Sequence, residues 1–384
     1  MRKKWILVLA FVVLTASLAF AAGGSSRAGG KPELNVWAGG SDNIRMLMED
    51  LADMFNKNPK YNQICTMKVQ FMPSGSSTQS LEDRLLAAYN SGQKNTTFDI
   101  VETNASNILR FQTEGGPDIF LPFDPAKIPN YAGVSARPPR GADVLVPYRG
   151  TTVLMIYDSA RVSNPPQNNQ ELVEWVKANP GRFGYNSPDS GGAGGSFVRT
   201  ALYNFLPAEA LMSDDPKWME EWDRGFNLLK EIHPYLYRSS GRVVYPNRNQ
   251  GALDLISNKE IDMCPMFADM VITQTKSGYI PSTVKLYQMN PALTGNLVGF
   301  VIPSFGRYYE EAHAFIDFML SVEAQDLSLA QNASIPVIDP SRLNPQNAAA
   351  IMGVSGGFRT EALGSIGAEI SRRWNDTIAT LPSN

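Results

Sequence analysis

Hydrophobic positions in the first third of the chain change repeatedly between the spacing of strands and the spacing of helices. Residues 34–37, 67–71 and 98–103 are short apolar or alternating stretches of strand length. Between them, apolar side chains recur at helical spacing over residues 43–56 and 79–91. Strands that alternate with helices predict parallel pairing through right-handed crossovers, and therefore an α/β fold.

The rest of the chain continues this mixture after a Pro- and Gly-rich excursion at residues 115–141. The extended stretch at residues 144–157 predicts a strand that crosses from one lobe into a second, and residues 260–266 predict the strand that returns. Helices are also expected at residues 169–179, 197–205, 218–231, 250–257 and 310–321 and in pieces over 346–380, and strands at 183–185, 284–287 and 297–302.

The N-terminus has the pattern of a secretory signal peptide. Three basic residues follow Met1, residues 5–20 are apolar, and small residues at 19–22 provide a cleavage site. The apolar run is short for a membrane span and lacks a basic stop-transfer flank. We therefore expect a signal peptide at residues 1–22, a flexible leader at 23–32, and a periplasmic protein without a cysteine for lipid attachment.

The length of the chain indicates the number of domains, and its net charge argues against one kind of partner. The chain without its signal is too long for one ordinary core, which predicts two domains. Loss of Arg2, Lys3 and Lys4 changes the formal net charge from −3 to about −6, which argues against a nucleic-acid partner.

Cysteine and histidine are rare, with two of each in the whole chain. Cys65 and Cys264 are expected to be separate buried thiols, although an oxidising compartment would allow them to pair. His233 and His313 have no ligand partner at metal-binding spacing, so we expect no metal site and no cofactor.

Several stretches resemble one known family. Residues 175–183, the following Gly loop and residues 197–203 are similar to a stretch found in some bacterial extracellular solute-binding proteins. Residues 312–325 are similar to that family's "A…FIDFLLSPEAQ" helix, and residues 260–266 are similar to its return strand. The resemblance covers most of the mature chain and lies near the thiamine-, iron- and polyamine-binding branches.

The resemblance implies a two-lobed periplasmic binding protein fold of type II, with crossing hinge strands and the ligand in the cleft between the lobes. Lobe 1 is then expected at residues 33–147 and 268–330, and lobe 2 at 148–267 and 331–384. It also implies a monomer that captures a small-molecule solute for the inner-membrane permease of an ABC importer. The ATPase would be a separate chain, in agreement with the lack of a Walker-type loop here.

Candidate ligand contacts lie where predicted strands end and helices begin, the edge at which open α/β sheets bind ligands. The Gly/Ser loop at residues 187–196 precedes a predicted helix, whose N-terminus would suit phosphate, sulfate or carboxylate. Ordinary helix capping is the alternative. The hydroxyl-rich residues 74–78 have the matching position in lobe 1. The candidates at these strand ends are Ser190, Gly194, Gly195, Ser196, Ser74, Gly75, Ser76, Thr78, Gly39, Ser41 and Asn104.

The crossing strands offer two alternatives that predict opposite ligand charge. Tyr148, Arg149 and Thr151 lie on the outgoing strand, where Arg149 could bind an anion or form a surface salt bridge. Asp269 follows the return strand and could instead pair with a cation such as thiamine or a polyamine. Aromatic walls for a cation, unless they pack in the core, would come from Trp37, Tyr148 or Tyr245. The sequence leaves both alternatives open, with a preference for an anionic group.

Two other functions compete with solute capture for import. A ligand-sensing receptor would share every feature named above and would differ only in its partner. An acyl-transfer enzyme on the same fold would need a nucleophile beside a base, but the chain has no Gly-x-Ser-x-Gly motif. We therefore expect a binding protein rather than an enzyme.

Overall fold

The computed structural model describes residues 30–73, 79–352 and 359–382, so the predicted signal peptide lies outside the described residues. The first strands and helices follow the predicted order. They are β1 (Glu33–Gly40), α1 (Asp42–Lys57), β2 (Thr66–Pro73), α3 (Leu81–Asn90), β3 (Ile100–Asn104) and α4 (Ala105–Gly115).

Parallel and antiparallel strands share the larger sheet. β1 pairs in parallel with both β2 and β3, as predicted, and the sheet then continues through antiparallel neighbours in the order β11-β5-β10-β3-β1-β2. The antiparallel strands are β10 (Gly295–Pro303), β5 (Val146–Asp158), the two-residue β11 (Ile335–Pro336) and β4 (Phe120–Leu121), which pairs with β10. The mixed sheet confirms the α/β prediction.

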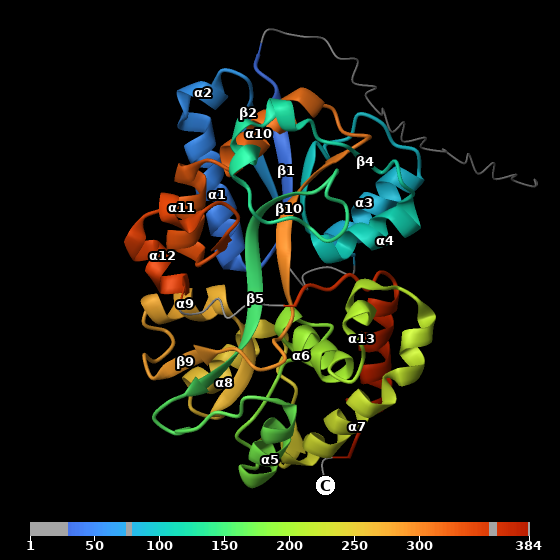
Figure 1. Cartoon of the computed structure of the whole chain (residues 1–384), viewed down its shortest axis with the longest axis vertical. Coiled ribbons are helices and arrows are strands. Elements are labelled where there is room, and N and C mark those ends of the chain that lie inside the picture. Colours follow the sequence, from blue (N-terminus) through green and yellow to red (C-terminus); the bar gives the residue numbers. More distant parts are fainter. Residues whose placement is uncertain (1–29, 74–78, 353–358, 383–384) are drawn as a thin grey trace, which may run out of the picture. The chain divides into compact units, whose positions relative to one another are not determined.

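β5 belongs to two parts of the molecule. Residues 146–152 pair with β10, while residues 153–158 pair with β8 (Met263–Phe267) and β9 (Val284–Tyr287). Figure 1 shows β5 as a long green strand that continues from the layer containing β1 and β10 to the layer containing β9 and α8. The predicted crossing strand is therefore confirmed, and its length of 13 residues serves both layers.

Helices cover each part on more than one side. α1, α2 (Pro59–Asn62), α10 (Tyr309–Met319), α11 (Val322–Asn332) and α12 (Pro345–Met352) belong to the first part, together with α3 and α4. The second part contains α5 (Asn169–Ala178), α6 (Gly192–Tyr203), α7 (Asp223–Ile232), α8 (Arg248–Ser257), α13 (Ile366–Thr377) and the hairpin β6 (Arg238–Ser239) and β7 (Arg242–Val243). α9 (Ala268–Lys276) directly follows β8.

Buried apolar side chains form separate cores around the two halves of β5. The first core joins α1 to β10 and α10 through Phe55, Phe300 and Phe315, and the second contains Phe197 and Trp222. Residues 270–293 contribute to the second core, whereas residues 329–348 contribute to the first. The expected lobe boundaries remain a prediction. The two clusters favour assigning residues 270–293 to lobe 2 and residues 331–348 to lobe 1.

Three predicted elements differ from the structure. The helix expected at residue 197 begins at Gly192, and the strand expected at 183–185 is a single bridge from Phe183 to Met263. The helix expected at residues 218–231 begins only at Asp223 as α7, after a 3-10 helix at Pro216–Glu221. The helix expected at residues 310–321 agrees with α10, which ends at Met319.

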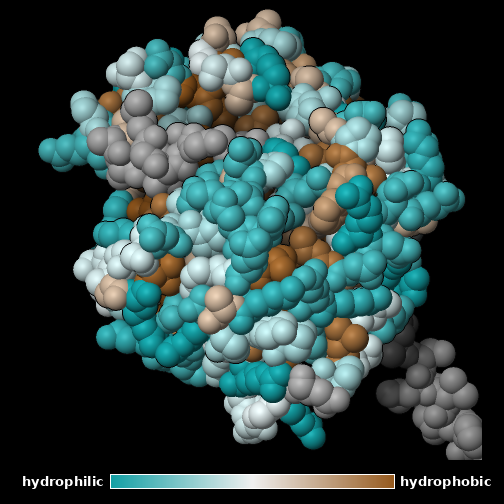
Figure 2. All heavy atoms as spheres, turned by 60° about the horizontal axis from the view of Figure 1, so that its bottom comes forward, coloured by the Kyte–Doolittle hydropathy of each residue, from teal (hydrophilic) through white to brown (hydrophobic). Residues whose placement is uncertain are grey.

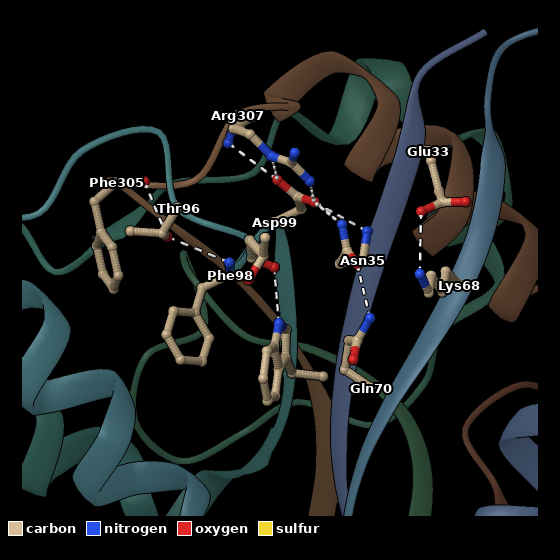
Figure 3. A network of polar contacts seen from close by, with 11 residues as sticks. Glu33, Asn35, Lys68, Gln70, Thr96, Phe98, Asp99, Phe305 and Arg307 are labelled. Atoms are coloured by element: carbon tan, nitrogen blue, oxygen red, sulfur yellow. Dashed lines mark hydrogen bonds and ion pairs between the residues drawn. The ribbon is translucent and has the colours of Figure 1, made fainter. Parts of the chain in front are cut away.

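A buried ionic network ties together the N-terminal ends of the parallel strands (Figure 3). The fully buried carboxylate of Asp99 accepts hydrogen bonds from Asn35 Nδ2 at 3.0 Å and from Arg307 Nη2 at 2.6 Å. Gln70 in turn donates to Asn35 Oδ1 at 2.9 Å. The network lies at the end of the strands opposite to the one where α1 and α4 begin.

The face of the molecule drawn in Figure 2 is mainly polar. On the face drawn in Figure 2, hydrophobic residues appear as small separated patches among hydrophilic ones. Within the described ranges, no helix is long and apolar enough to cross a membrane.

Candidate ligand-binding site

A cavity of about 560 Å³ lies where helices α1, α6, α8 and α9 begin. Some of its walls come from elements of the first core and others from elements of the second, with β5 between them. The lining residues are Gly39, Gly40, Ser41, Asp42, Asn43, Ile44, Pro73, Arg149, Thr151, Ser190, Gly191, Gly192, Arg248, Asn249, Gln250, Phe267, Asp269, Met270 and Gln274. A cavity of this size suits a small organic molecule.

The structure brings six of the predicted contact residues to this one cavity. They come from the end of β1, from the middle of β5, from the loop before α6 and from the start of α9. These residues are Gly39, Ser41, Arg149, Thr151, Ser190 and Asp269. The predicted residues Ser74, Gly75, Ser76 and Thr78 lie outside the described residues.

The Gly/Ser loop is shorter than predicted, and its last three candidates do not line the cavity. Gly194, Gly195 and Ser196 are buried in the first turns of α6. A Cβ atom at Gly194 would lie 1.8 Å from the carbonyl oxygen of Asn186. This glycine therefore permits close backbone packing, which explains its position without a ligand.

The first N–H groups of α6 also have partners within the protein. Gly194 N–H donates to Asn186 Oδ1 at 2.9 Å, and Ala193 N–H donates to Asn249 Oδ1 at 3.1 Å. A helix N-terminus attracts anions through unpaired N–H groups, so these bonds weaken the expected anion site.

Three candidates, Asn104, Ser196 and Tyr245, are engaged elsewhere. The side chain of Asn104 caps α4 by accepting from Asn107 N–H at 3.2 Å, and Ser196 Oγ bonds to Thr294. Tyr245 packs edge-on against Trp374 and lines a different cavity. The structure does not bring these three candidates to the cavity at α1.

Arg149 forms a buried ion pair, rather than the surface salt bridge that was one of its two alternatives. Its Nη2 lies 3.2 Å from Glu102 Oε1, and its Nε donates to the hydroxyl oxygen of Tyr148 at 2.8 Å. The Tyr148 hydroxyl donates to the same Glu102 oxygen at 2.6 Å, and burial raises the pKa of Tyr148 above its usual value. Arg149 therefore contributes to the cavity wall while its charge is balanced by Glu102.

Asp269 is a buried carboxylate at the start of α9. The residue is 8% exposed, its Oδ2 accepts a long side-chain hydrogen bond, at 3.3 Å, from Asn43 Nδ2, and the backbone N–H groups of Asp269 and Met270 also favour its charged form. Its Oδ1 is buried and has no hydrogen-bond partner among the described residues. Burial raises the pKa of Asp269, although the nearby charge of Arg149 opposes this shift.

The sequence analysis missed several lining residues, chiefly Asn43, Arg248, Asn249 and Gln250. Asn43 follows Ser41 at the start of α1, so the rule of strand ends could have identified it. The start of α8 does not follow a strand, and that rule could not find its residues. Arg248 has a left-handed backbone with φ of 62°, which is uncommon outside glycine and asparagine.

Comparison with known proteins gives one family and many similar folds. The model of the family described as bacterial extracellular solute-binding protein matches residues 50–352. Protein YnjB of Escherichia coli (strain K12) is 26% identical over 233 residues, which cover 57% of this chain and 58% of that protein.

Solved structures of transport proteins have a similar fold. An ABC transporter protein from Clostridium perfringens has a TM-score of 0.65 at 15% identity and covers 89% of this chain and 99% of its own. The spermidine/putrescine substrate-binding protein PotD from Streptococcus pneumoniae has a TM-score of 0.64 at 14% identity, with coverages of 91% and 98%. Iron-bound HitA from Pseudomonas aeruginosa has a TM-score of 0.62 at 15% identity, with coverages of 89% and 99%.

Proposed function

This chain belongs to the family of bacterial extracellular solute-binding proteins, and from this membership we propose that it captures a small solute in the cavity at the start of α1, α6, α8 and α9. One observation carries the assignment to this cavity: its walls come from both cores. A ligand held there contacts both parts at once, so it stabilises the conformation in which they are close.

The lobe division follows from the same reasoning. We take lobe 1 as the first core, with residues 33–148 and 296–348, and lobe 2 as the second core, with residues 149–295 and 361–382. The chain crosses between the lobes at β5 and at the start of β10. Residues 149–152 of β5 and residues 294–296 at the start of β10 belong to neither core, so they are the expected hinge.

The solute would then be delivered to an ABC importer outside the cytoplasm. The basic and apolar N-terminal pattern supports export to the periplasm through a cleaved signal peptide. The proposed partners are an inner-membrane permease and a separate ATPase, with this chain acting as a monomer. The solved relatives are named for different solutes, including polyamines, thiamin and iron, and they do not determine the solute of this chain.

A binding role agrees with the surroundings of both histidines. His313 is buried, and its Nε2 accepts a hydrogen bond from Asp124 N–H at 2.9 Å. His233 is buried and bonds to the Tyr245 hydroxyl at 2.8 Å. Neither residue lines the cavity at α1, so neither is placed to act as a base on a solute bound there.

Ligand-dependent stability tests this function. The purified protein is unfolded and refolded to remove any bound compound, and its Tm is then measured with sugars, amines, organic acids, thiamine and ferric complexes. A compound at a hundred times its Kd adds about 2.7 kcal/mol of stability, which gives a clear shift. Phe267 lines the cavity, so the Phe267→Ala variant is expected to bind the stabilising compound with a Kd more than tenfold higher and to show a smaller Tm shift.

Phe98→Ala serves as the matched control, because Phe98 lies against Trp37 and Phe305, outside the cavity. It is expected to lower the Tm of the free protein but to leave the Kd within about twofold. Equal losses of affinity in the two variants would contradict the proposed position of the site. Absence of any stabilising compound, together with no small molecule recovered from the native protein, would contradict the binding function.

A further inference from the structure

We propose that the solute carries a positively charged nitrogen and that the carboxylate of Asp269 binds it. This inference rests on the proposed function and adds the chemical class of the ligand. The class comprises small organic cations and zwitterions, such as amines and amino acids. The structure supports it through three features of the cavity wall: an incompletely bonded carboxylate, an imbalance of buried charge, and an aromatic ring that lines the same cavity.

The first feature is the hydrogen bonding of Asp269. A buried carboxylate normally accepts several hydrogen bonds, because removal from water is otherwise costly. The backbone N–H groups of Asp269 and Met270 act on this carboxylate, but the one side-chain donor to Oδ2 is Asn43, at 3.3 Å, and Oδ1 has no hydrogen-bond partner within the described part of the chain. Asn43 Nδ2 also donates to Asn332 Oδ1 at 2.5 Å, so this amide is shared. An ammonium group in the cavity would supply the missing donors.

The second feature is the balance of charge behind the cavity wall. Arg149 interacts with two buried carboxylates, since it pairs with Glu102 at 3.2 Å and its charge also favours the ionised form of Asp269. Glu102 and Asp269 are 6% and 8% exposed, respectively. One guanidinium therefore faces two buried acidic groups, and a cationic ligand would complete the compensation. An anionic ligand would add a third negative charge beside them.

The third feature is the ring of Phe267, which precedes α9 and lines the same cavity. A Cβ atom at Gly192 would lie 3.0 Å from Phe267 Cζ, so the ring sits close against the start of α6. A ring face near a carboxylate is a favourable environment for an ammonium or other nitrogen cation. Phe267 replaces the aromatic residues expected from the sequence, of which none lines this cavity.

The α6 N-terminus, the main argument for an anion, is weakened by its bonds to Asn186 and Asn249. Arg248 lies at the exposed edge of the cavity. This arrangement separates a positive group at the edge from a negative group in the wall. This separation accommodates a ligand that also carries a carboxylate, provided that its charged nitrogen lies at Asp269.

The experiment compares matched probes on the full-length mature protein. Calorimetry and Tm shifts are measured with putrescine, spermidine, thiamine, 4-aminobutyrate and lysine, and with the counterparts 1,4-butanediol, succinate and butyrate. In parallel, the compound released by denaturing protein isolated from its native host is identified by mass spectrometry. We expect the recovered compound and the strongest probes to contain a cationic nitrogen.

Variants of the cavity wall test the contact itself. Asp269→Asn keeps the shape of the side chain and is expected to weaken binding of the best probe at least thirtyfold. Phe267→Leu keeps an apolar side chain but removes the ring, and is expected to weaken binding about three- to tenfold. Asp118→Asn removes one exposed carboxylate away from the cavity and is expected to leave affinity unchanged.

The outcomes separate this inference from the proposed function. A ligand without a cationic nitrogen, or a cationic ligand that Asp269→Asn binds as tightly as the natural protein, would overturn the inference and leave solute binding established. A recovered cation whose affinity depends on Asp269 supports both. Failure to recover a compound or to detect binding of any probe, with a folded protein, counts against both.

Discussion

Asp269 has a carboxylate that suits a cationic ligand, but this carboxylate is buried. Burial raises its pKa, against the effect of Arg149, so the folded protein binds a proton at this site more readily than the unfolded chain does. The free protein therefore loses stability as the pH rises from the ordinary aspartate pKa through the raised value. A bound cation would compensate the negative charge of Asp269 and restore this stability. The affinity for a cation should therefore depend on the ionisation of Asp269.

Asp269→Asn is expected to stabilise the ligand-free protein near neutral pH by about 1 kcal/mol, because the variant avoids burying an incompletely bonded charge. The advantage should shrink as the pH falls through the raised pKa of Asp269, because the natural side chain then becomes protonated. The other charged groups that line the cavity are Arg149 on β5, Asp42 on α1 and Arg248 on α8. Urea unfolding of both proteins across this pH range measures the difference. A less stable variant at neutral pH would contradict the prediction.

The Arg149–Glu102 pair has the opposite character, since both charges have partners. Arg149→Met should destabilise the protein by about 3 kcal/mol, because it leaves Glu102 buried without its cation. The double variant Arg149→Met/Glu102→Gln should recover much of this loss. Urea unfolding of the single and double variants forms a double-mutant cycle, and simple additivity would show that the two residues are not coupled.

At the scale of elements, the start of α6 shows why a glycine-rich stretch is ambiguous. Glycine can permit the approach of a ligand or the approach of the protein's own backbone, and both uses give the same sequence. The stretch before Phe197 contains both cases. Gly191 and Gly192 line the cavity, whereas Gly194 contacts the backbone of Asn186.

Gly194→Ala is expected to destabilise the protein by at least about 2 kcal/mol, since the added Cβ would overlap the Asn186 carbonyl oxygen. The matched control is Gly367→Ala in the first turn of α13, where the nearest atom to the added Cβ is 3.6 Å away. That variant should be neutral or more stable, because alanine favours helix. Thermal unfolding of the two variants tests the difference, and equal Tm values would contradict it.

At the scale of the whole molecule, β5 couples the two cores, and the cysteines report on each core separately. Cys65 belongs to the first core and Cys264 to the second, and both are free and buried. Burial raises the pKa of Cys65 to about 12 and raises the pKa of Cys264 as well. Neither thiol should react with a thiol reagent in the native protein.

With increasing denaturant, both cysteines should become reactive over the same concentration range, because unfolding either core exposes part of the shared strand β5. Mass spectrometry of labelled peptides distinguishes the two positions. The Cys65→Ser and Cys264→Ser variants confirm the assignment of each signal. Distinct midpoints would show that the lobes unfold independently and that the crossing strands do not couple them.

The sequence alone determined the type and order of most elements, the crossing of residues 144–157 and the family resemblance. These follow from local periodicity, since an apolar period of two or of 3.6 residues requires a strand or a helix that buries one face. It also identified the strand ends at Gly39 and Ser41 and both charged candidates, Arg149 and Asp269. It predicted no helix at residues 322–332, where α11 carries few large apolar side chains among polar ones.

Only the tertiary structure decided how those candidates differ. Glu102 is 47 residues from Arg149 in sequence, and Asn43 is 226 residues from Asp269, so no local pattern reveals that one charge is paired and the other is incompletely bonded. The same holds for Asn186 and Asn249, whose side chains occupy the helix N-terminus that the sequence offers to an anion. Hydrogen bonds between distant residues depend on the assembled fold, and in this protein they distinguish the charge of the expected ligand.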